Sequence, residues 1–247
     1  MAKVRIDKLL FDLGLAPSRE RAQALIMAGA VLADDRPIDK AGTAIEETAR
    51  IEVRGDDNPF VSRGGLKLDG ALADLGIDVA GMVVLDVGAS TGGFTDCCLQ
   101  RGARRVFAVD VGTNQLDYKL RRDPRVASLE QVNARALEPA MFDEPADLAV
   151  IDVSFISLTL ILAPALRCLA PGGEILAMVK PQFEAGRDKV GKGGVVRDPA
   201  VRAEAVEKVV AHAAGLGLAC TGRAESRLPG PKGNRETFVR LAREGRP

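Results

Sequence analysis

The sequence predicts an α/β fold, with a parallel β-sheet covered by helices, preceded by a small α+β module. Two observations support this. Residues 82–100 read as an apolar strand, a glycine-rich turn and a helix, and apolar runs then alternate regularly with amphipathic segments. The first 54 residues instead suggest two short helices and several short strands. We therefore expect residues 1–58 to form one domain with its linker, and residues 59–247 to form a second.

Composition excludes several classes of protein. Hydrophobic residues make up 47% of the 247 residues, which is enough for a sizeable core and argues against disorder. No apolar run approaches the ~20 residues that span a bilayer, and no signal peptide is visible, so we expect a cytoplasmic protein without a membrane partner. One histidine and four cysteines without a Cys-x-x-Cys pair argue against a metal site. Because the net charge is zero, any nucleic-acid-binding surface must be local.

The amino-terminal module begins with two predicted helices. Residues 5–13 place apolar side chains on one face, and Ser18 is a good N-cap for a helix over residues 19–28. Short strands should follow near residues 31–32, 44–45 and 50–53. Five cations lie on the two helices or next to them: Lys3, Arg5, Lys8, Arg19 and Arg21. Any one of them could simply be solvated, but five together indicate a face that contacts phosphates.

The glycine-rich turn of the second domain has the spacing Asp-x-Gly-x-x-x-Gly, beginning at Asp86. Glycines let a backbone approach a ligand closely and adopt positive φ. A dinucleotide site has Gly-x-Gly-x-x-Gly facing a pyrophosphate, and the charge of Asp86 would repel that group. S-adenosylmethionine instead carries an ammonium group and a cationic sulfonium. The turn therefore favours this methyl donor over a dinucleotide, while a turn without any ligand stays open.

A second acid strengthens the case for a ligand. Asp110 ends the next strand, residues 105–109, where it could accept hydrogen bonds from ribose hydroxyls. We therefore predict S-adenosylmethionine as the cofactor. The predicted cofactor-binding residues are Asp86, Gly88, Ala89, Ser90, Thr91, Gly92, Gly93, Phe94 and Asp110.

Later strands of the second domain also end in charged residues. Asp152 follows the apolar run 148–151, and Lys180 follows the run 175–179, which begins after a turn at residues 171–173. The carboxyl ends of parallel strands meet at one edge of a sheet, where ligands bind. That edge would carry Asp86, Asp110, Asp152 and Lys180. Turns are polar, so one such residue means little, but four on one edge indicate a site.

The remaining segments complete the alternation. Helices are predicted at residues 64–75, 114–120, 156–169 and 199–214, and strands at residues 126–129, 218–223 and 237–241. Ser62 should cap the first helix, and Lys67 lies in its first turn, where periodicity alone favours an ordinary exposed lysine. Residues 182–197 form a glycine-rich basic loop whose cations could reach RNA phosphates, although a plain flexible loop explains it nearly as well.

Three segments of the first module carry a family resemblance: RIDKLL at residues 5–10, GLAPSRERA at residues 14–22 and LIMAGAV at residues 25–31. Together they resemble the S-four-type RNA-binding domain. The resemblance implies that the second helix and the following turn dock on structured RNA, chiefly through Arg19 and Arg21. That family often has Asn-Gly in the hairpin turn, whereas this chain has two acids at residues 34–35, which would repel a phosphate there.

Five motifs follow in order in the second domain: VSRGG at residues 61–65, GASTGGF at 88–94, DVSFISL at 152–158, VKPQFE at 179–184 and GNRE at 233–236. Together they resemble the bacterial hemolysin-A-like ribosomal RNA ribose methyltransferases. The resemblance implies a Rossmann-like class I methyltransferase domain, whose parallel sheet has one antiparallel strand. It also implies methylation of cytidine 2′-hydroxyls in large-subunit and, in some members, small-subunit ribosomal RNA.

The resemblance further implies a Lys-Asp-Lys-Glu catalytic tetrad, which matches Lys67, Asp152, Lys180 and Glu236. A lysine is a weak base until burial or another cation lowers its pKa. We assign Lys180 the contact with the ribose hydroxyl and the other three a positioning role. The predicted partner is ribosomal RNA or a ribosomal subunit. Its predicted contacts are Lys8, Arg19, Arg21, Arg63, Arg187 and Lys189.

Three other functions stay open at this point. A pseudouridine synthase can carry the same RNA-binding module, but it needs a catalytic aspartate in a different fold. A non-catalytic ribosome-assembly factor would bind RNA without using the tetrad. The family name hemolysin suggests a cytolysin, although no membrane-spanning or strongly amphipathic lytic segment is visible.

Overall fold

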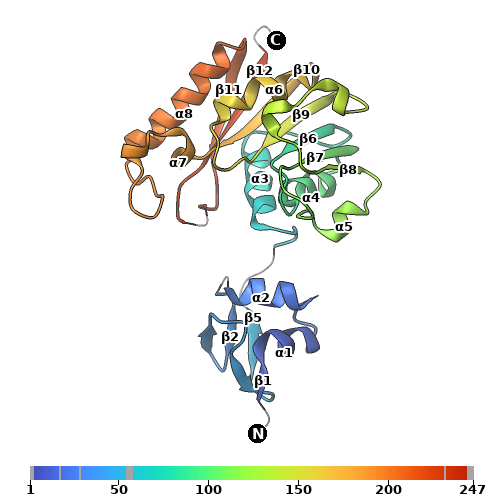
Figure 1. Cartoon of the computed structure of the whole chain (residues 1–247), viewed down its shortest axis with the longest axis vertical. Coiled ribbons are helices and arrows are strands. Elements are labelled where there is room, and N and C mark those ends of the chain that lie inside the picture. The colour runs from blue at the N-terminus through green and yellow to red at the C-terminus, as the bar shows by residue number, and fades with distance from the viewer. Residues whose placement is uncertain (1–2, 17, 28, 54–57, 231, 244–247) are drawn as a thin grey trace. The chain divides into compact units, whose positions relative to one another are not determined.

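The computed structural model describes residues 3–16, 18–27, 29–53, 58–230 and 232–243, so residues 54–57, at the end of the predicted first domain and its linker, lie outside the described part. The chain forms two compact units, residues 1–59 and 60–247. Figure 1 shows the elements of both units. The described residues of each unit enclose their own hydrophobic core.

The small unit has an α+β fold. Its elements are β1 (Lys3–Arg5), α1 (Ile6–Asp12), α2 (Arg19–Met27), β2 (Val31–Ala33), β3 (Arg36–Ile38), β4 (Ala44–Glu46) and β5 (Ile51–Val53). β1 pairs with β4, and β2 lies between β3 and β5, with all neighbours antiparallel. Ile6, Leu10 and Ile26 are fully buried between the helices and strands. Ser18 accepts a hydrogen bond from the Arg21 amide at 3.2 Å, as its predicted capping role requires.

The large unit is built on a seven-stranded sheet in the order β11-β12-β10-β9-β6-β7-β8. The strands are β6 (Val83–Val87), β7 (Arg105–Val109), β8 (Val126–Leu129), β9 (Ala146–Ile151), β10 (Leu169–Val179), β11 (Leu218–Glu225) and β12 (Thr237–Arg243). Neighbouring strands are parallel except that β12 runs antiparallel to both β10 and β11. The prediction of a parallel sheet with one antiparallel strand is confirmed.

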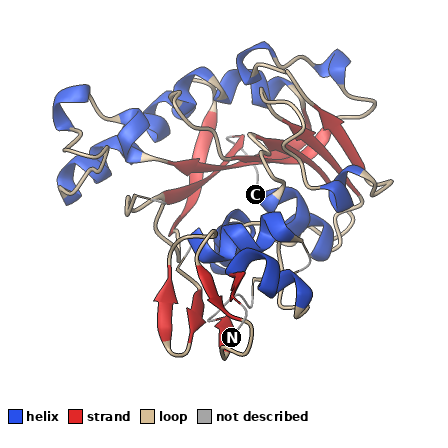
Figure 2. Cartoon of the chain, turned by 60° about the horizontal axis from the view of Figure 1, so that its bottom comes forward, coloured by secondary structure: helices blue, strands red, loops and turns tan. Residues whose placement is uncertain are grey.

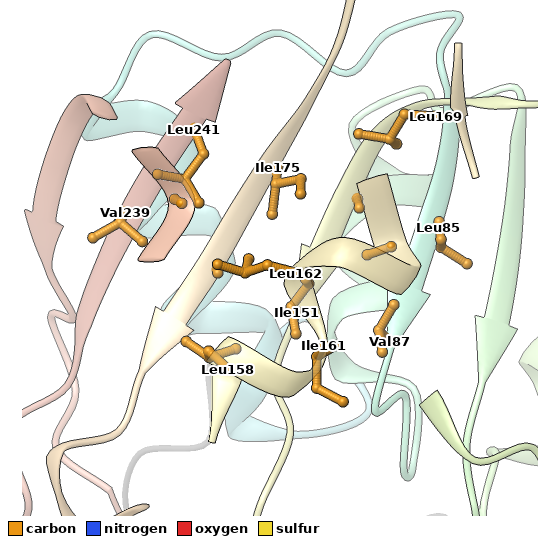
Figure 3. Packing of buried hydrophobic residues seen from close by; sticks show 14 of the residues in the cluster. Leu85, Val87, Ile151, Leu158, Ile161, Leu162, Leu169, Ile175, Val239 and Leu241 are labelled. Carbon is orange, nitrogen blue, oxygen red and sulfur yellow. The ribbon is translucent and has the colours of Figure 1, made fainter. Parts of the chain in front are cut away.

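Helices cover both faces of this sheet, which Figure 2 shows as red arrows between blue helices. α3 (Arg63–Asp74) and α4 (Gly93–Gln100) pack on one face, and α6 (Leu162–Arg167) and α8 (Pro199–Ala214) on the other. Leu85 and Val87 point to the second face, where they belong to the same buried cluster as Ile161, and Figure 3 shows Val87 near Ile161. Each such buried side chain stabilises the fold by about 1.5–3 kcal/mol relative to exposure. The alternation along β6 therefore determines which face each residue occupies.

Short elements fill the connections: α5 (Tyr118–Arg121), α7 (Pro181–Glu184) and the 3₁₀ turns η1 (Ala134–Ala136), η2 (Pro139–Met141), η3 (Leu158–Leu160) and η4 (Arg187–Lys189). Two helix predictions were too long. The predicted helix at residues 114–120 is reduced to α5, because Asn114 adopts a positive φ of 55° that a helix does not allow. The predicted helix at residues 156–169 is divided into η3 and α6.

The predicted turn at residues 171–173 is instead part of β10. Leu169 pairs with Ala146 and Glu174 with Leu148, so β10 holds an irregularity of several residues between these pairs. Gly172 has a φ of 84°, and a Cβ on Gly173 would lie 3.0 Å from the Ala146 carbonyl oxygen. The glycines thus let the strand bend against β9 without leaving the sheet.

Candidate active site

The carboxyl edge of the sheet brings together the charged residues that follow its strands. Asp152 follows β9, Lys180 follows β10, and Glu236 immediately precedes the antiparallel β12. Val179 pairs with Thr237, so Lys180 and Glu236 are the next positions along two neighbouring strands. Three adjacent strands thus deliver an acid, an amine and a second acid to one place.

The first ion pair at this edge joins Lys67, on α3, to Glu236. Lys67 Nζ lies 2.5 Å from Glu236 Oε2, and the two side chains are 9% and 1% exposed. The expectation of an ordinary exposed lysine at position 67 was wrong. Helical periodicity ignores a partner 169 residues away, and a buried ammonium is tolerated only because that acid neutralises it.

The second ion pair joins Lys180 to Asp152. Lys180 Nζ contacts Asp152 Oδ1 and donates a hydrogen bond to Ser154 Oγ at 2.9 Å. Its backbone is extended, with φ −104° and ψ 105°, as the following Pro181 requires. An ammonium has three donors, so these two partners leave one for a substrate oxygen. Ser154 was not predicted, although it lies in the DVSFISL motif.

Gly88 allows the glycine-rich turn to touch the end of β9. It has a φ of 88°, and a Cβ there would lie 2.6 Å from the Asp152 carbonyl oxygen, so a side chain cannot be accommodated. The turn therefore lies directly against one of the tetrad residues. Ser90 also adopts a positive φ, of 49°, which aims its amide at Asp110.

Asp110 organises the donor side of the turn. Its Oδ2 accepts a hydrogen bond from the Ser90 amide at 2.8 Å, and its Oδ1 accepts one from the Gly112 amide at 2.7 Å. Each carboxylate oxygen can accept about two hydrogen bonds, so both keep capacity for a ligand hydroxyl. The predicted ribose contact is compatible with this geometry.

A hollow that is open to solvent lies beside this turn. Its lining residues are Ala89, Ser90, Ala108, Asp110, Gly112, Gln115, Leu116, Ser128 and Glu130. Only Ala89, Ser90 and Asp110 of these were predicted. Ser128 and Glu130 lie at the carboxyl end of β8, on the same edge of the sheet. This position at the end of a predicted strand could have identified them from the sequence. The hollow, the close-packed glycines and the free acceptor capacity of Asp110 fit a nucleoside-type donor such as S-adenosylmethionine.

Six of the nine predicted donor contacts do not line this hollow, and Asp86, Gly93 and Phe94 are three of them. Asp86 is fully buried, accepts a hydrogen bond from Thr95 Oγ1 at 2.6 Å and does not line the hollow. Phe94 is buried in the core, with its ring centroid 6.1 Å from that of Phe238. A Cβ on Gly93 would lie 2.2 Å from Ser62 Oγ, so this glycine lets α3 and α4 approach each other. Ser62 precedes α3 but makes no capping hydrogen bond, contrary to its predicted role.

Burial also sets the charge state of Asp86. It raises the pKa of the Asp86 carboxyl to about 7, while the hydrogen bond from Thr95 opposes the rise and the charge of Asp152 adds to it. The strand alternation of β6 turns this side chain toward the face covered by α3 and α4, away from solvent. Within the described residues its Oδ1 has no hydrogen-bond partner.

Two cations of the small unit, Arg5 and the predicted RNA contact Arg19, pair with a buried acid. Asp7 is fully buried and accepts hydrogen bonds from the guanidinium groups of Arg5 and Arg19, from Gln23 and from the Lys8 amide. The Arg5 guanidinium holds the pKa of the Asp7 carboxyl well below its usual range. The side chains of Arg5 and Arg19 stay 55% and 48% exposed. Lys8 is exposed, and Arg21 is half-buried.

The predicted RNA contacts of the large unit are Arg63, at the start of α3, and Arg187 and Lys189, in η4. Arg63 is exposed, and its Nη2 donates to the Pro229 carbonyl at 3.2 Å. Lys189 is exposed and pairs with Glu204 at 2.5 Å. The side chain of Arg187 lies outside the described part of the chain.

An exposed aromatic residue flanks the Asp152–Lys180 pair. Phe155 is 91% exposed and adopts a φ of 64°, which is rare for a bulky side chain. Its ring centroid lies 5.2 Å from that of Phe183 on α7. The loop that carries Phe155 is held by Glu184, which accepts hydrogen bonds from the Ser157 hydroxyl and the Leu158 amide, each at 2.6 Å.

Family models match both units. Residues 60–243 match the FtsJ-like methyltransferase model, and residues 4–51 match the S4 domain model. No helix of the described residues is long and apolar enough to cross a membrane.

Several known proteins are similar over nearly the whole chain. The 16S/23S rRNA (cytidine-2′-O)-methyltransferase TlyA of Mycobacterium tuberculosis is 48% identical, over 97% of this chain and 90% of its own length. Hemolysin A of Brachyspira hyodysenteriae is 41% identical, over 94% of this chain and 97% of its own length. A solved structure of a candidate hemolysin from Streptococcus thermophilus has 45% identity and a TM-score of 0.79, covering 100% of this chain and 90% of that one.

Proposed function

Because this chain belongs to the TlyA/hemolysin A family of S-adenosylmethionine-dependent rRNA 2′-O-methyltransferases, with an S-four-type amino-terminal domain and an FtsJ-like catalytic domain, we propose that it methylates the 2′-hydroxyl of a cytidine in ribosomal RNA. One observation carries the proposal. Two lysine–acid pairs, Lys67–Glu236 and Lys180–Asp152, stand at the sheet edge that the glycine-rich turn touches. We favour large-subunit rRNA as the substrate, and we expect the reaction to take place in the cytoplasm.

The methyl donor and the target ribose have separate places in this proposal. S-adenosylmethionine, when bound, supplies a methyl group already activated by its sulfonium charge. The protein therefore mainly has to align the hydroxyl for an in-line displacement, and alignment alone can lower a barrier substantially. Ala89, Ser90 and Asp110 would hold the nucleoside part of the donor, since they line the hollow. Gly88 brings that part against the end of β9.

Lys180 is the group we assign to the ribose hydroxyl. Asp152 and Ser154 hold its Nζ in place and leave one donor position open. That position would contact the hydroxyl oxygen and stabilise the negative charge that develops as the proton leaves. The Lys67–Glu236 pair lies at the neighbouring strand end, where it keeps a second buried amine next to this charge.

Phe155 suggests how the target nucleotide is presented. Enzymes that modify a nucleotide commonly unstack its base and stack it on an aromatic side chain. Phe155 is solvent-exposed three residues after Asp152, so a base stacked on it would place its ribose near the Lys180–Asp152 pair. This feature favours an RNA substrate over a small molecule.

Mass mapping of rRNA from cells with and without the protein tests the proposed function, and a single methylated cytidine should disappear in its absence.

In vitro, Lys180→Ala should reduce single-turnover methyl transfer to rRNA by at least ~10²-fold, the lower range for losing a positioned acid–base group. Lys180→Arg should not restore activity, because a guanidinium stays protonated and is larger.

Donor binding is the matched control for these variants. Calorimetric titration of S-adenosylmethionine should be unchanged in Lys180→Ala, because Lys180 does not line the hollow. Near-normal transfer by Lys180→Arg would remove Lys180 from the chemistry. If mass mapping finds the same rRNA methylation in cells with and without the protein, the proposed function as a whole is contradicted.

A further inference from the structure

One buried side chain joins two loops beside the tetrad. Asn234 is 2% exposed, and its Oδ1 accepts a hydrogen bond from the Val196 amide at 2.9 Å. Its Nδ2 donates to the Gly194 carbonyl at 2.8 Å. The loop of residues 186–197 is therefore attached to the loop of residues 226–236. Because Asn234 is buried, both hydrogen bonds are shielded from water and hold the two loops together.

The glycine-rich loop is itself folded where the structure describes it. The Gly191 amide donates to the Val195 carbonyl at 3.1 Å, and the Gly194 amide donates to the Gly191 carbonyl at 3.0 Å. Gly193 and Gly194 have φ values of 84° and 79°, which close this small hairpin. Val196, directly after it, is 1% exposed. The described residues of this loop therefore form a small hairpin, which the sequence analysis did not predict.

The two joined loops are strongly basic. In sequence they contain seven lysines and arginines but two acids. Some of these cations have acidic partners, such as Arg227 with Asp74 and Arg235 with Glu225. Three others are exposed and form no ion pair with any residue that the structure describes: Lys192, Arg197 and Lys232. A Cβ on Gly194 would lie 3.9 Å from Lys232 Nζ, so this amine sits beside the hairpin of the other loop.

These loops are also anchored to the catalytic residues. Glu236, the partner of Lys67, follows Asn234 by two residues. The Gly230 amide donates to the Asn234 carbonyl at 2.8 Å, and Arg63 at the start of α3 donates to the Pro229 carbonyl at 3.2 Å. The loops that carry Lys192, Arg197 and Lys232 are therefore connected to Glu236 and to α3, which hold the two members of the Lys67–Glu236 pair.

We propose that Lys192, Arg197 and Lys232 form a phosphate clamp for the RNA strand on either side of the target ribose, and that Asn234 positions it by joining its two loops. The proposal rests on the proposed function, because it takes the strand that carries the target ribose as the occupant. A single strand presents one negative charge per nucleotide, which matches a row of cations without acidic partners. The nearby acid Asp198 accepts a hydrogen bond from the Ala200 amide at 2.8 Å, so its carboxylate is turned toward the start of α8.

The test measures binding of an rRNA fragment by the full chain at several salt concentrations, together with KM and kcat for methyl transfer. The triple variant Lys192→Ala/Arg197→Ala/Lys232→Ala should lower the slope of log affinity against log salt by about 2, since each phosphate contact on a single strand contributes about 0.7. KM for RNA should rise about 10-fold or more, while kcat changes less than about twofold. The matched control is Arg243→Ala, an exposed cation at the far end of β12, which should leave the slope unchanged.

Asn234→Ala separates positioning from simple stability. It should raise KM in the wild-type background but not further in the triple variant, because the clamp it positions is already gone. Asn234→Asp keeps the acceptor for Val196 and should lie between wild type and Asn234→Ala. If Asn234 has only a structural role, Asn234→Ala should instead lower the melting temperature and kcat by the same amount in both backgrounds.

The two proposals fail in different ways. An unchanged salt slope and KM in the triple variant, with rRNA still methylated by the wild-type protein, would overturn the clamp alone. A wild-type protein that binds the donor but does not methylate any rRNA would overturn the proposed function instead.

Discussion

The two units each bury an aspartate completely, yet the two carboxyls are held in opposite ways. Asp7 in the small unit is surrounded by guanidinium groups, and its pKa lies well below the usual range. Asp86 in the large unit accepts its hydrogen bond from the neutral hydroxyl of Thr95, and burial raises its pKa to about 7. Burial alone therefore does not determine the charge of an acid, because the partner that burial brings with it decides the sign of the shift.

The same contrast separates the proposed RNA-binding surface from the proposed catalytic site. In the small unit Asp7 is buried while its partners Arg5 and Arg19 are about half-exposed. The buried acid therefore holds the two arginines in a fixed geometry at the surface. At the sheet edge of the large unit the cation is inside as well, since Lys67 is 9% exposed against a fully enclosed Glu236. Exposed cations suit a phosphate backbone, whereas enclosed amines suit a reaction that must exclude water.

The largest effect is expected at the enclosed pair. Lys67→Met leaves Glu236 buried without its lysine, which should destabilise the large unit by about 3–5 kcal/mol. The double variant Lys67→Met/Glu236→Gln should recover most of that stability without recovering methyl transfer. Urea unfolding, monitored by hydrogen exchange of the α3 and β12 amides, measures the stability of the large unit. Single-turnover methyl transfer to rRNA measures the activity. Stability losses that simply add in the double variant would show that the pair is not coupled.

The second test concerns Asp86 and pH. Because its folded pKa of about 7 lies above the unfolded value, the folded state binds more protons between about pH 4 and pH 7, and Asp86 lowers the free energy of unfolding as pH rises through that window. Asp86→Asn removes this effect. The stability of the variant relative to wild type should therefore grow by about 3 kcal/mol from pH 4 to pH 7.

Hydrogen exchange of the β6 amides across this pH range reports the change within the large unit. Thr95→Val is the matched control. It removes the hydroxyl that lowers the pKa of Asp86, so it should extend the pH window upward. A constant difference between Asp86→Asn and wild type over about pH 4–7 would contradict the assignment.

Asp7 should behave with the opposite sign and a smaller size. Because the pKa of Asp7 is lowered in the folded state, its ionised carboxylate stabilises the small unit at pH values above the usual carboxyl pKa. This stabilisation is lost as the pH falls toward the pKa of the folded state. Because the partner arginines are about half-exposed and solvent screens them, Asp7→Asn should cost on the order of 1–2 kcal/mol at about pH 7. Exchange rates of α1 and α2 amides should show the loss at neutral pH and convergence with wild type in acid.

The smallest effect is expected for the exposed arginines themselves. Replacing Arg19 and Arg21 by Ala should lower the salt slope of rRNA binding by roughly one unit for each phosphate contact that is lost. The small unit should also lose some stability, because Arg19 is one of the two arginines that pair with the buried Asp7. Affinity for S-adenosylmethionine should stay constant in the same protein. An unchanged salt slope would mean that these side chains are only solvated.

Local pattern was enough for the fold class and for much of the candidate site. The apolar runs predicted β6, β9 and β10, because strand alternation and burial are properties of a few consecutive residues. The same reasoning placed Asp152 and Lys180 at one edge, since parallel strands end together. The order of the motifs along the chain pointed to the family without any tertiary information.

Tertiary structure alone decided which of these residues meet and which face each occupies. Lys67 and Glu236 stand 169 positions apart, and periodicity in α3 cannot show that an acid beside β12 will bury that lysine. Asp86 and Phe94 lie in the turn motif, yet packing against α3 and α4 turns both away from the hollow. Asn234 reads as one polar residue in a loop until its two hydrogen bonds across the fold are seen. Sequence patterns record short-range preferences, while pairing between distant residues is settled only when the whole core closes.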